Sequence, residues 1–275
     1  MRFLVVGDFH GKFPKSISKI VRKQNIDAVI SNGDYCPFYY RELWFKHSYR
    51  TKTELWEVIG KKKMRELLKK DLKSGEDTLR KLNNLKIPIF TVAGNLDYIN
   101  YSDVSDKNYK PKWVWYDQDF FAKLIKKYSN ILRFDYKQFN FGGFCFIGAY
   151  GQTFPGNVKS KSYNKHKKIL NNFFFKNKNR RIIFVSHNVP YNTKLDKIGS
   201  HAHVLVRGKH FGSKLIRRTI DKWQPLIHIG GHIHEGRGIQ KIGKTICINQ
   251  GSVHENQGAI LEIIKDKVKV NLIKL

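Results

Sequence analysis

The chain has 275 residues and carries 52 Lys and Arg against 22 Asp and Glu, a formal net charge of +30 with neutral histidines. This length can bury a full core, and contents of 41% hydrophobic and 13% aromatic residues exclude a disordered basic tail. Three widely spaced cysteines exclude a disulfide scaffold and suit the cytoplasm, and no apolar run is long enough to span a membrane. The first residues turn polar after six, so we expect a strand there and not a signal peptide.

Buried strands and amphipathic helices alternate along the whole chain. The expected strands, in chain order, are Arg2–Val6, Asp27–Ser31, Ile87–Val92, Phe144–Tyr150, Arg181–Ser186, Leu226–Ile229, Lys244–Asn249, Ala259–Ile264 and Val268–Ile273. The expected helices are Pro14–Gln24, Thr78–Leu85, Asp117–Tyr128, Tyr163–Phe175 and Ser213–Trp223. This alternation predicts an α/β core, and the closing strands add antiparallel pairing. Because neither a repeat nor a linker interrupts the pattern, we expect residues 1–275 to form a single domain.

Two segments depart from the alternation of strands and helices. Tyr35–Lys73 reads as a basic, aromatic-rich insertion at about residues 35–75, helical in its second half. Tyr98–Tyr116 reads as a loop with several Tyr and Trp residues. Aromatic rings interleaved with lysines could stack on bases, but packing of the insertion onto the core is the expectation for any single ring.

The positive charge is concentrated in the middle of the chain. Between Tyr136 and Ile220, Asp196 is the only acid among seventeen Lys and Arg. The positive electrostatic field of such a basic segment attracts phosphates. A composition rich in Lys, Asn and Ile explains many of the lysines, but it explains the shortage of acids less well. We therefore expect an anionic, phosphorylated substrate, and nucleic acid is a possible partner.

Polar residues follow one predicted strand after another, at the point where each strand ends. They are Asp8, His10, Asp34, Asn95, His187, His232 and His234. Because sites in α/β sheets form beyond the carboxyl ends of the strands, five strand ends are expected to converge on one crevice. Carboxylate, amide and imidazole ligands suit Mn, Fe, Zn, Ni or Co. Seven ligands exceed the needs of one ion and indicate two divalent ions that share a carboxylate.

The ordered series Asp-x-His, Gly-Asp, Gly-Asn, His and Gly-His-x-His resembles the calcineurin-like metallophosphoesterase superfamily over essentially the whole chain. Ser186–Thr193 and Gly231–Gly238 are most similar to the archaeal and bacterial phosphodiesterase type. The resemblance implies a four-layer αββα sandwich of mixed sheets with a dinuclear metal centre. It also implies a ligand set in which one ion is held by Asp8, His10 and His234, the other by Asn95, His187 and His232, and Asp34 bridges them.

One position departs from this pattern. Many family members have His after the Gly-Asn pair, where it helps to protonate the leaving group, but here Leu96 follows Asn95. This Gly-Asn-x-Asp variant is found in active phosphodiesterases and in a scaffold-like relative. Asp97 could orient a metal ligand or could be a loop or helix-capping carboxylate.

Three histidines of one loop, His201, His203 and His210, are candidates for the missing acid. We expect His210 to contact the substrate because it precedes a helix whose N-terminus, capped by Ser213, could bind anions. Exposure or packing is the alternative role for each of them.

The leading hypothesis is a metal-dependent phosphohydrolase, specifically a phosphodiesterase, in which a hydroxide bridging two metal ions attacks a phosphoester in line. The expected catalytic residues are Asp34, Asn95 and His210. A nuclease or nucleic-acid end-processing phosphoesterase is an alternative, favoured by the basic and aromatic segments. A non-catalytic scaffold is another, disfavoured by the complete ligand set.

Overall fold

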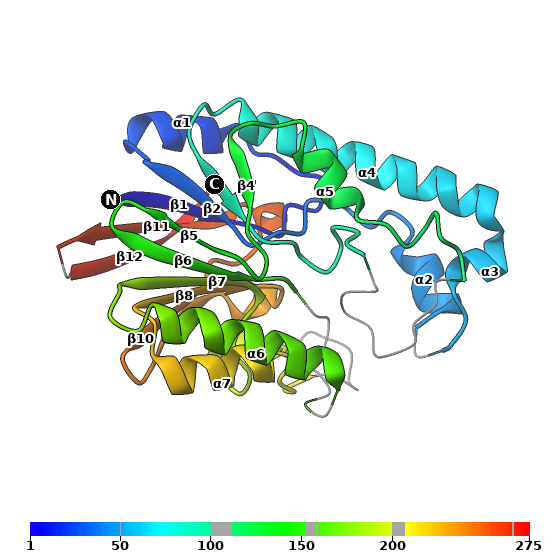
Figure 1. Cartoon of the computed structure of the whole chain (residues 1–275). Helices are drawn as coiled ribbons and strands as arrows, with labels where there is room; N and C mark the ends of the chain where they lie inside the picture. Colours follow the sequence, from blue (N-terminus) through cyan, green and yellow to red (C-terminus); the bar gives the residue numbers. More distant parts are fainter. Residues whose placement is uncertain (50, 101–111, 152–157, 159, 200–206, 266) are drawn as a thin grey trace.

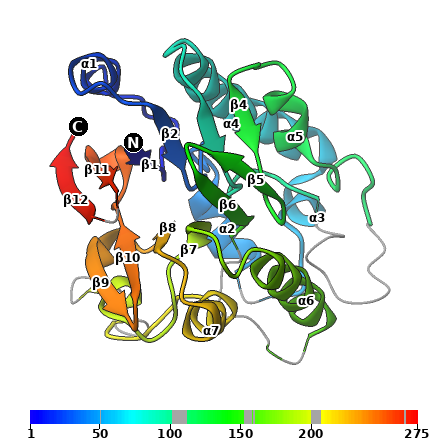
Figure 2. The same ribbon diagram turned by 60° about the vertical axis from the view of Figure 1, so that its left-hand side comes forward.

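The computed structural model describes residues 1–49, 51–100, 112–151, 158, 160–199, 207–265 and 267–275. Two six-stranded mixed sheets pack face to face, and helices cover the outer face of each (Figures 1 and 2). The expected four-layer αββα sandwich is therefore confirmed. Within the described ranges, no helix combines the length and apolarity that a membrane crossing requires.

The first sheet has the strand order β12-β11-β1-β2-β3-β4. Its strands are β1 (Arg2–Val6), β2 (Ala28–Ser31), β3 (Ile89–Thr91), β4 (Ile131–Arg133), β11 (Gln257–Ile264) and β12 (Lys267–Lys274). Strands β1 to β4 are parallel, whereas β11 pairs antiparallel with β1 and with β12. Because side chains alternate along a strand, Phe3 and Val5 face the second sheet while Leu4 and Val6 face the helices. The carboxyl ends of β1, β2 and β3 consequently lie at one edge.

The second sheet has the strand order β5-β6-β7-β8-β10-β9. Its strands are β5 (Gln138–Phe141), β6 (Phe144–Ala149), β7 (Ile182–Asn188), β8 (Ile227–Gly231), β9 (Gly238–Ile242) and β10 (Thr245–Asn249). Strands β6, β7, β8 and β10 are parallel, and the edge strands β5 and β9 are antiparallel to their neighbours. Strands β4, β5 and β9 are not predicted from the sequence, because all three are short edge strands with half-exposed side chains.

Helices complete the outer layers. On the first sheet lie α1 (Ser16–Lys23), α5 (Phe120–Ile125) and the C-terminal part of α4 (Lys61–Asn83). On the second sheet lie α6 (Lys161–Lys176) and α7 (Lys214–Trp223). The short 3₁₀ turns η2 (Lys194–Asp196), η3 (His234–Gly236) and η4 (Val253–Glu255) follow strand ends and shape the loops there.

The predicted helix Thr78–Leu85 is too short. It is the end of α4, a helix of 23 residues that starts inside the insertion. Its buried residues Met64, Leu68, Leu79 and Leu82 keep a helical spacing across the expected boundary, which explains why no break occurs. Together with α2 (Arg41–His47) and α3 (Leu55–Ile59), the N-terminal part of α4 projects to one side of the sandwich (Figure 1).

The aromatic rings of this projection pack against one another. Trp113 is buried in a cluster with Tyr40, Leu55 and Met64, and Trp56 packs against it. Basic side chains from α4 cover these rings, with the Arg65 guanidinium 4.9 Å from the centre of the Trp115 ring. These rings therefore pack the insertion against the segment that contains Trp113 and Trp115, and packing is the expectation for any single ring.

Candidate metal centre

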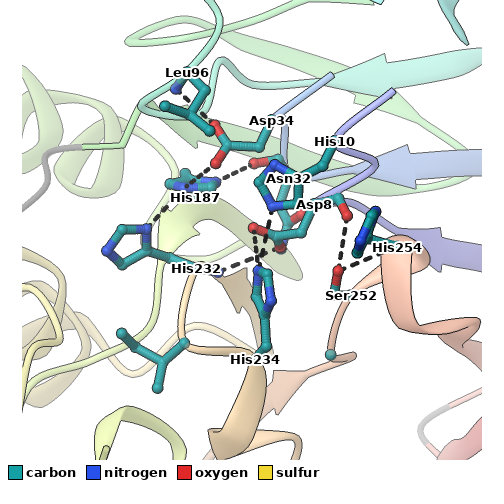
Figure 3. Close-up of polar contacts among 12 residues, drawn as sticks. Asp8, His10, Asn32, Asp34, Leu96, His187, His232, His234, Ser252 and His254 are labelled. Carbon is teal, nitrogen blue, oxygen red and sulfur yellow. Dashed lines mark hydrogen bonds and ion pairs between the residues drawn. The ribbon is translucent and has the colours of Figure 1, made fainter. Parts of the chain in front are cut away.

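The loops after five strands carry the seven predicted ligands to the seam between the two sheets. From the first sheet, Asp8 and His10 follow β1, Asp34 follows β2 and Asn95 follows β3. From the second sheet, His187 lies at the end of β7, and both His232 and His234 follow β8. Figure 3 shows six of them pointing toward one another, with Asp8 near the middle. The convergence that the strand pattern predicts is therefore present.

One group is formed by Asp8, His10 and His234, whose ligand atoms all lie within 4.8 Å of one another. His10 Nε2 is 3.4 Å from His234 Nε2, which is 3.4 Å from Asp8 Oδ1. Asp8 is fully buried, and among the described residues its Oδ1 atom accepts no hydrogen bond. A buried carboxylate oxygen without a donor, facing two imidazole nitrogens, fits a divalent cation.

A second group surrounds His187, which is completely buried. His187 Nδ1 lies 2.8 Å from the carbonyl oxygen of Asn32. Because a carbonyl only accepts, this nitrogen carries the proton, and in the neutral ring Nε2 has a lone pair. His187 Nε2 lies 2.8 Å from Asn95 Oδ1, 3.2 Å from His232 Nδ1 and 3.5 Å from Asp34 Oδ2. Acceptor atoms that converge in this way fit a cation between them.

Asp34 lies between the two groups, since its carboxylate, that of Asp8 and the His187 ring also have ligand atoms within 4.8 Å of one another. The main-chain N–H of Leu96 donates to Asp34 Oδ1 at 2.8 Å. A Cβ atom on Gly94 would overlap this same carboxylate oxygen, so only glycine lets β3 end so close to Asp34. This contact, and not a proton transfer, is the role that the structure gives to the segment containing Leu96.

Asp97 holds the backbone on which Asp34 is mounted. Its buried carboxylate accepts hydrogen bonds from the main-chain N–H groups of Asp34 and Tyr35, both at 2.8 Å, and of Gly94 at 2.7 Å. Of the two roles considered for Asp97, the geometry therefore favours orientation of a predicted ligand.

Four of the predicted ligands have left-handed backbone conformations. The φ angles are 51° at Asp8, 45° at His10, 56° at Asp34 and 70° at His232. Such values are uncommon for residues other than glycine and cost free energy, so they persist where the surrounding structure imposes them. Here they turn each strand end sharply and aim its side chain into the seam.

Burial and mutual contact shift the pKa values of these groups. Burial, together with the Asp8 charge, raises the pKa of Asp34 to about 7. Burial lowers the pKa of His232 to about 3. Burial alone would lower the pKa of His234, but contact with Asp8 raises it to about 9. Conversely, the histidines outweigh burial at Asp8 and lower its pKa below the ordinary value. A cation entering the centre therefore competes with protons on Asp34 and His234.

His210 is not part of either group. Its Nδ1 atom lies 2.7 Å from a carboxylate oxygen of Asp196, in the loop before α7. Asp196 is completely buried and also accepts the main-chain N–H groups of Thr193 at 2.7 Å and Gly212 at 2.9 Å. Ser213 caps α7 as predicted, its hydroxyl accepting from Ile216 N at 3.3 Å. The other two candidates of this loop, His201 and His203, lie outside the described residues.

Several residues that support the centre are not predicted from the sequence. Asn32 orients His187, Ser252 donates its hydroxyl to the carbonyl of Asp8 at 2.8 Å, and Glu255 lies 3.6 Å from His234 Nδ1. Asp196 was also missed as the partner of His210. Two of them have a feature in the sequence that could have indicated them. Asn32 follows directly on β2, and Asp196 is the sole acid of the basic segment between Tyr136 and Ile220.

Comparisons with known proteins agree with this geometry. Residues 1–236 match the model of the calcineurin-like phosphoesterases. An uncharacterized protein of Methanocaldococcus jannaschii is 36% identical over 134 residues, or 46% of this chain, and the match spans about half (51%) of that relative. One crystal structure shares the fold with a TM-score of 0.68 at 19% identity over 98% of both chains. A Thermus thermophilus structure has a TM-score of 0.59 at 14% identity, covering 98% of this chain and 97% of that one.

The family match covers well over half of the chain, and it agrees with the fold and with the cluster of metal-type ligands. The chain therefore belongs to the calcineurin-like phosphoesterases, which hydrolyse phosphoric esters with a pair of divalent metal ions.

Proposed function

We propose that this chain is a phosphodiesterase. One ion would be held by Asp8, His10 and His234, the other by Asn95, His187 and His232, with Asp34 between them. The observation that carries the metal assignment is the convergence of acceptor atoms on His187 Nε2 together with the unpaired Asp8 Oδ1, which fits a divalent cation in each group. When bound, two divalent ions would polarise the phosphoryl oxygens and lower the pKa of a water molecule that supplies the nucleophile.

The charge around the predicted ligands supports a diester substrate. Within the described ranges, no Lys or Arg side chain bonds to any of the seven ligands. A phosphodiester carries one negative charge, whereas a phosphomonoester carries nearly two at neutral pH. In the described part of the chain the ligands therefore have no bonded Lys or Arg that would offset the second charge of a monoester, which supports the diester.

Residues of this chain would hold the reacting groups in place. Asp34 is fixed through its side chain by Leu96 N and through its backbone by Asp97, so its carboxylate cannot turn away from the seam. His187 is fixed by the Asn32 carbonyl, which sets the tautomer that presents Nε2. This orientation in advance of substrate binding is what a two-metal centre needs from the protein.

We assign the protonation of the leaving group to His210. Its loop is tied to the ligand-bearing loops on two sides. Ser213 N donates to Val189 O at 2.8 Å, two residues after His187. Asn249 Nδ2 donates both to Leu195 O at 3.2 Å and to Ile233 O at 2.7 Å, which joins η2 to the loop of His232.

The carboxylate of Asp196 engages His210 Nδ1 and leaves Nε2 available for the substrate. As the bond between phosphorus and the leaving oxygen breaks, His210 Nε2–H would donate its proton to that oxygen. In this role His210 takes the place of the acid that Leu96 cannot provide.

A substrate panel tests the proposed function. The protein is loaded with Mn, Ni, Co or Mg and assayed on bis-p-nitrophenyl phosphate, p-nitrophenyl phosphate and cyclic nucleotides. We expect the diester to be hydrolysed faster than the monoester, and Asp8→Ala to lower the rate by roughly 10³-fold. Asp77→Ala, which removes an exposed carboxylate of α4, is the matched control. Preference for the monoester would contradict the diesterase assignment, and inactivity with every metal would favour the scaffold.

A nuclease is the second candidate, and the basic helices favour it. Between Lys161 and Lys176, α6 contains five lysines and no acid, and α7 lies beside it on the outer face of the second sheet (Figure 1). A short single-stranded oligonucleotide in the same panel distinguishes this alternative. Cleavage that weakens steeply between about 50 and 200 mM salt would support it.

A further inference from the structure

A pocket of about 550 Å³ lies beside the metal centre, where the edges of the two sheets meet. It is bounded by α5 on one side and α6 on the other, with β4 and the end of β6 between them (Figure 2). Its apolar walls are Ala122, Ile125, Ile131, Leu132 and Ile169. This volume lies within the range of pockets that hold small organic ligands.

The floor of the pocket consists of three interlocked rings. Tyr136 stacks on His166 with ring centres 4.1 Å apart and planes 12° apart, and it meets Tyr150 edge-on at 4.8 Å. The Tyr150 hydroxyl lies 3.0 Å from His166 Nε2. His166 and Tyr150 are buried and pack against Tyr136, so the partly exposed ring of Tyr136 is the aromatic surface that the floor offers to a ligand.

Basic side chains outnumber acidic ones around the pocket. It is lined by Lys126, Lys137, Lys165 and Arg133 against Asp119 and Asp135, an excess of two positive charges (four minus two). Both acids are already engaged with Arg133, and each also accepts a main-chain N–H. The three lysines are exposed, and in the described part of the chain no acid forms an ion pair with Lys126 or Lys137. The rim is therefore suited to an anion.

Two backbone contacts join this pocket to the metal centre. Asp135 in the pocket lining accepts the main-chain N–H of Ala93 at 2.7 Å, two residues before Asn95. Gly151, which follows Tyr150, donates to the Ala93 carbonyl at 3.0 Å, and a Cβ on it would overlap the His187 ring. A ligand in the pocket would thus lie behind the strand ends that carry two predicted metal ligands.

We infer that this pocket is a binding site for a nucleoside phosphate. The lysines of its rim would bind the phosphate, and the apolar walls and the Tyr136 floor would take the base and ribose. The occupant is either the part of a phosphodiester substrate beyond the scissile bond or a separate nucleotide. The binding itself does not depend on the proposed function, whereas its identification as part of the substrate does.

Binding is measured on the full chain in the presence of a chelator, so that the metal centre contributes nothing. Calorimetry with adenosine monophosphate is expected to show one saturable site, and inorganic phosphate to bind at least tenfold more weakly. The double variant Lys137→Glu/Lys165→Glu is expected to weaken nucleotide binding by about tenfold or more. The double variant Lys19→Glu/Lys23→Glu, an equal change of four charges at exposed positions of α1, is the matched control and should bind like the wild type.

Three results would overturn the inference. They are the absence of saturable binding, equal affinity for phosphate and nucleotide, and equal weakening by Lys19→Glu/Lys23→Glu and by the double variant of the pocket. Ala122→Phe fills the pocket without changing its charge and should also abolish nucleotide binding. It tests steric exclusion of the ligand separately from the electrostatic attraction that the lysine variants remove. Circular dichroism of each variant shows that a loss of binding is not a loss of fold.

The two sources of the nucleotide are distinguished on the metal-loaded protein. If the pocket holds part of the substrate, adenosine monophosphate raises the KM for a dinucleotide, and the pocket variants raise that KM without changing kcat on bis-p-nitrophenyl phosphate. If the occupant is a separate nucleotide, its addition changes kcat on bis-p-nitrophenyl phosphate, and the pocket variants remove this response. Saturable nucleotide binding by a protein without any hydrolytic activity would support the pocket while contradicting the proposed function.

Discussion

The carboxylate of Asp97 accepts a hydrogen bond from the main-chain N–H of Asp34 at 2.8 Å. The same carboxylate accepts the N–H groups of Tyr35 and Gly94, so one buried side chain joins the ends of β2 and β3. Asp34 therefore owes its position to a residue that is not itself a predicted ligand. Asn95 is predicted to bind an ion, whereas Asp97, two residues further along the chain, holds the backbone of another predicted ligand.

Replacing Asp97 by Asn is expected to weaken metal binding. An amide has one acceptor oxygen, and its NH₂ group would oppose one of the N–H donors that Asp97 now accepts. The expected loss of metal affinity is about 10- to 100-fold, measured by competition with a chromophoric chelator. Asp77→Asn on the exposed face of α4 serves as the control. Unchanged affinity in the Asp97 variant would show that Asp97 supports the fold and not the centre.

Metal affinity is expected to rise with pH in two stages. Without metal, burial raises the pKa of Asp34 to about 7, and contact with Asp8 raises the pKa of His234 to about 9. Below pH 7 a cation must displace protons from both groups, and between pH 7 and 9 from His234 alone. The apparent affinity should therefore increase up to about a hundredfold per pH unit below about pH 7 and about tenfold above it. The same affinity from about pH 6 to 9 in chelator competition would refute this coupling.

His228 is expected to make stability depend on pH. Its Nε2 atom lies 2.8 Å from the Ser186 hydroxyl, and burial lowers its pKa to about 3. Between that value and the ordinary 6.5, the unfolded chain binds a proton that the folded chain excludes, so the free energy of unfolding falls as pH falls. His228→Gln should reduce this slope by about 1.4 kcal/mol per pH unit in urea unfolding at about pH 4.5 to 6. The exposed His254→Gln should leave it unchanged, and equal slopes in all three proteins would exclude His228 as the cause.

The effect of Leu96 on the rate of hydrolysis should depend on the leaving group. Since Leu96 cannot donate a proton, esters of p-nitrophenol, which leave without protonation, are expected to turn over faster than alkyl esters. Because His210 is the proposed acid, Leu96→His should raise the rate on an alkyl phosphodiester by about 10²-fold relative to the p-nitrophenyl ester only in a protein that also carries His210→Gln. Leu96→Asn, polar but unable to serve as an acid, is the control. An equal gain on both substrates would mean that proton transfer does not limit the slower one.

His210 and Asp196 are expected to act as a unit. His210→Gln should slow alkyl esters by about 10²-fold while leaving p-nitrophenyl esters within a few-fold of the wild type. Asp196→Asn should produce the same selective loss and shift the pH profile of kcat, a change that a merely structural role would not cause. Leu96→His should restore part of the lost rate in the His210 variant. Equal losses on both substrates would place His210 outside proton transfer.

The parts of the site that sequence could predict are those defined by local pattern. A buried strand that ends in Gly-Asp or Gly-Asn shows both where the chain turns and which side chain it presents, so Asp34 and Asn95 were predicted as ligands without knowledge of the sheet. The sandwich was implied by the resemblance that those same strand ends carry, and the alternation of strands and helices agreed with it. The short edge strands β4 and β5 were not identifiable, because they have only 3 and 4 residues and their side chains are mostly only partly buried.

The parts that could not be predicted depend on contacts between distant segments. The pairing of His210 with Asp196 exists because the loop closes on itself through the bridge between Lys197 and His210. The pocket beside the centre combines Lys126 with Lys165, which no local pattern relates. Such features follow from how loops close and how helices dock, which depends on the packing of the whole domain.

The left-handed backbone at Asp8, His10, Asp34 and His232 has a consequence for how the ions enter and leave. Each of these conformations costs about 1–3 kcal/mol and is imposed by the sheets and turns around it. The metal site is therefore preformed, because its loops have this conformation before the ions bind. Removal of the metal ions should leave these loops folded. The far-ultraviolet circular dichroism spectrum should therefore stay the same while activity disappears. Loading should then be fast and reversible, limited by the arrival of the ion and not by refolding of the loops.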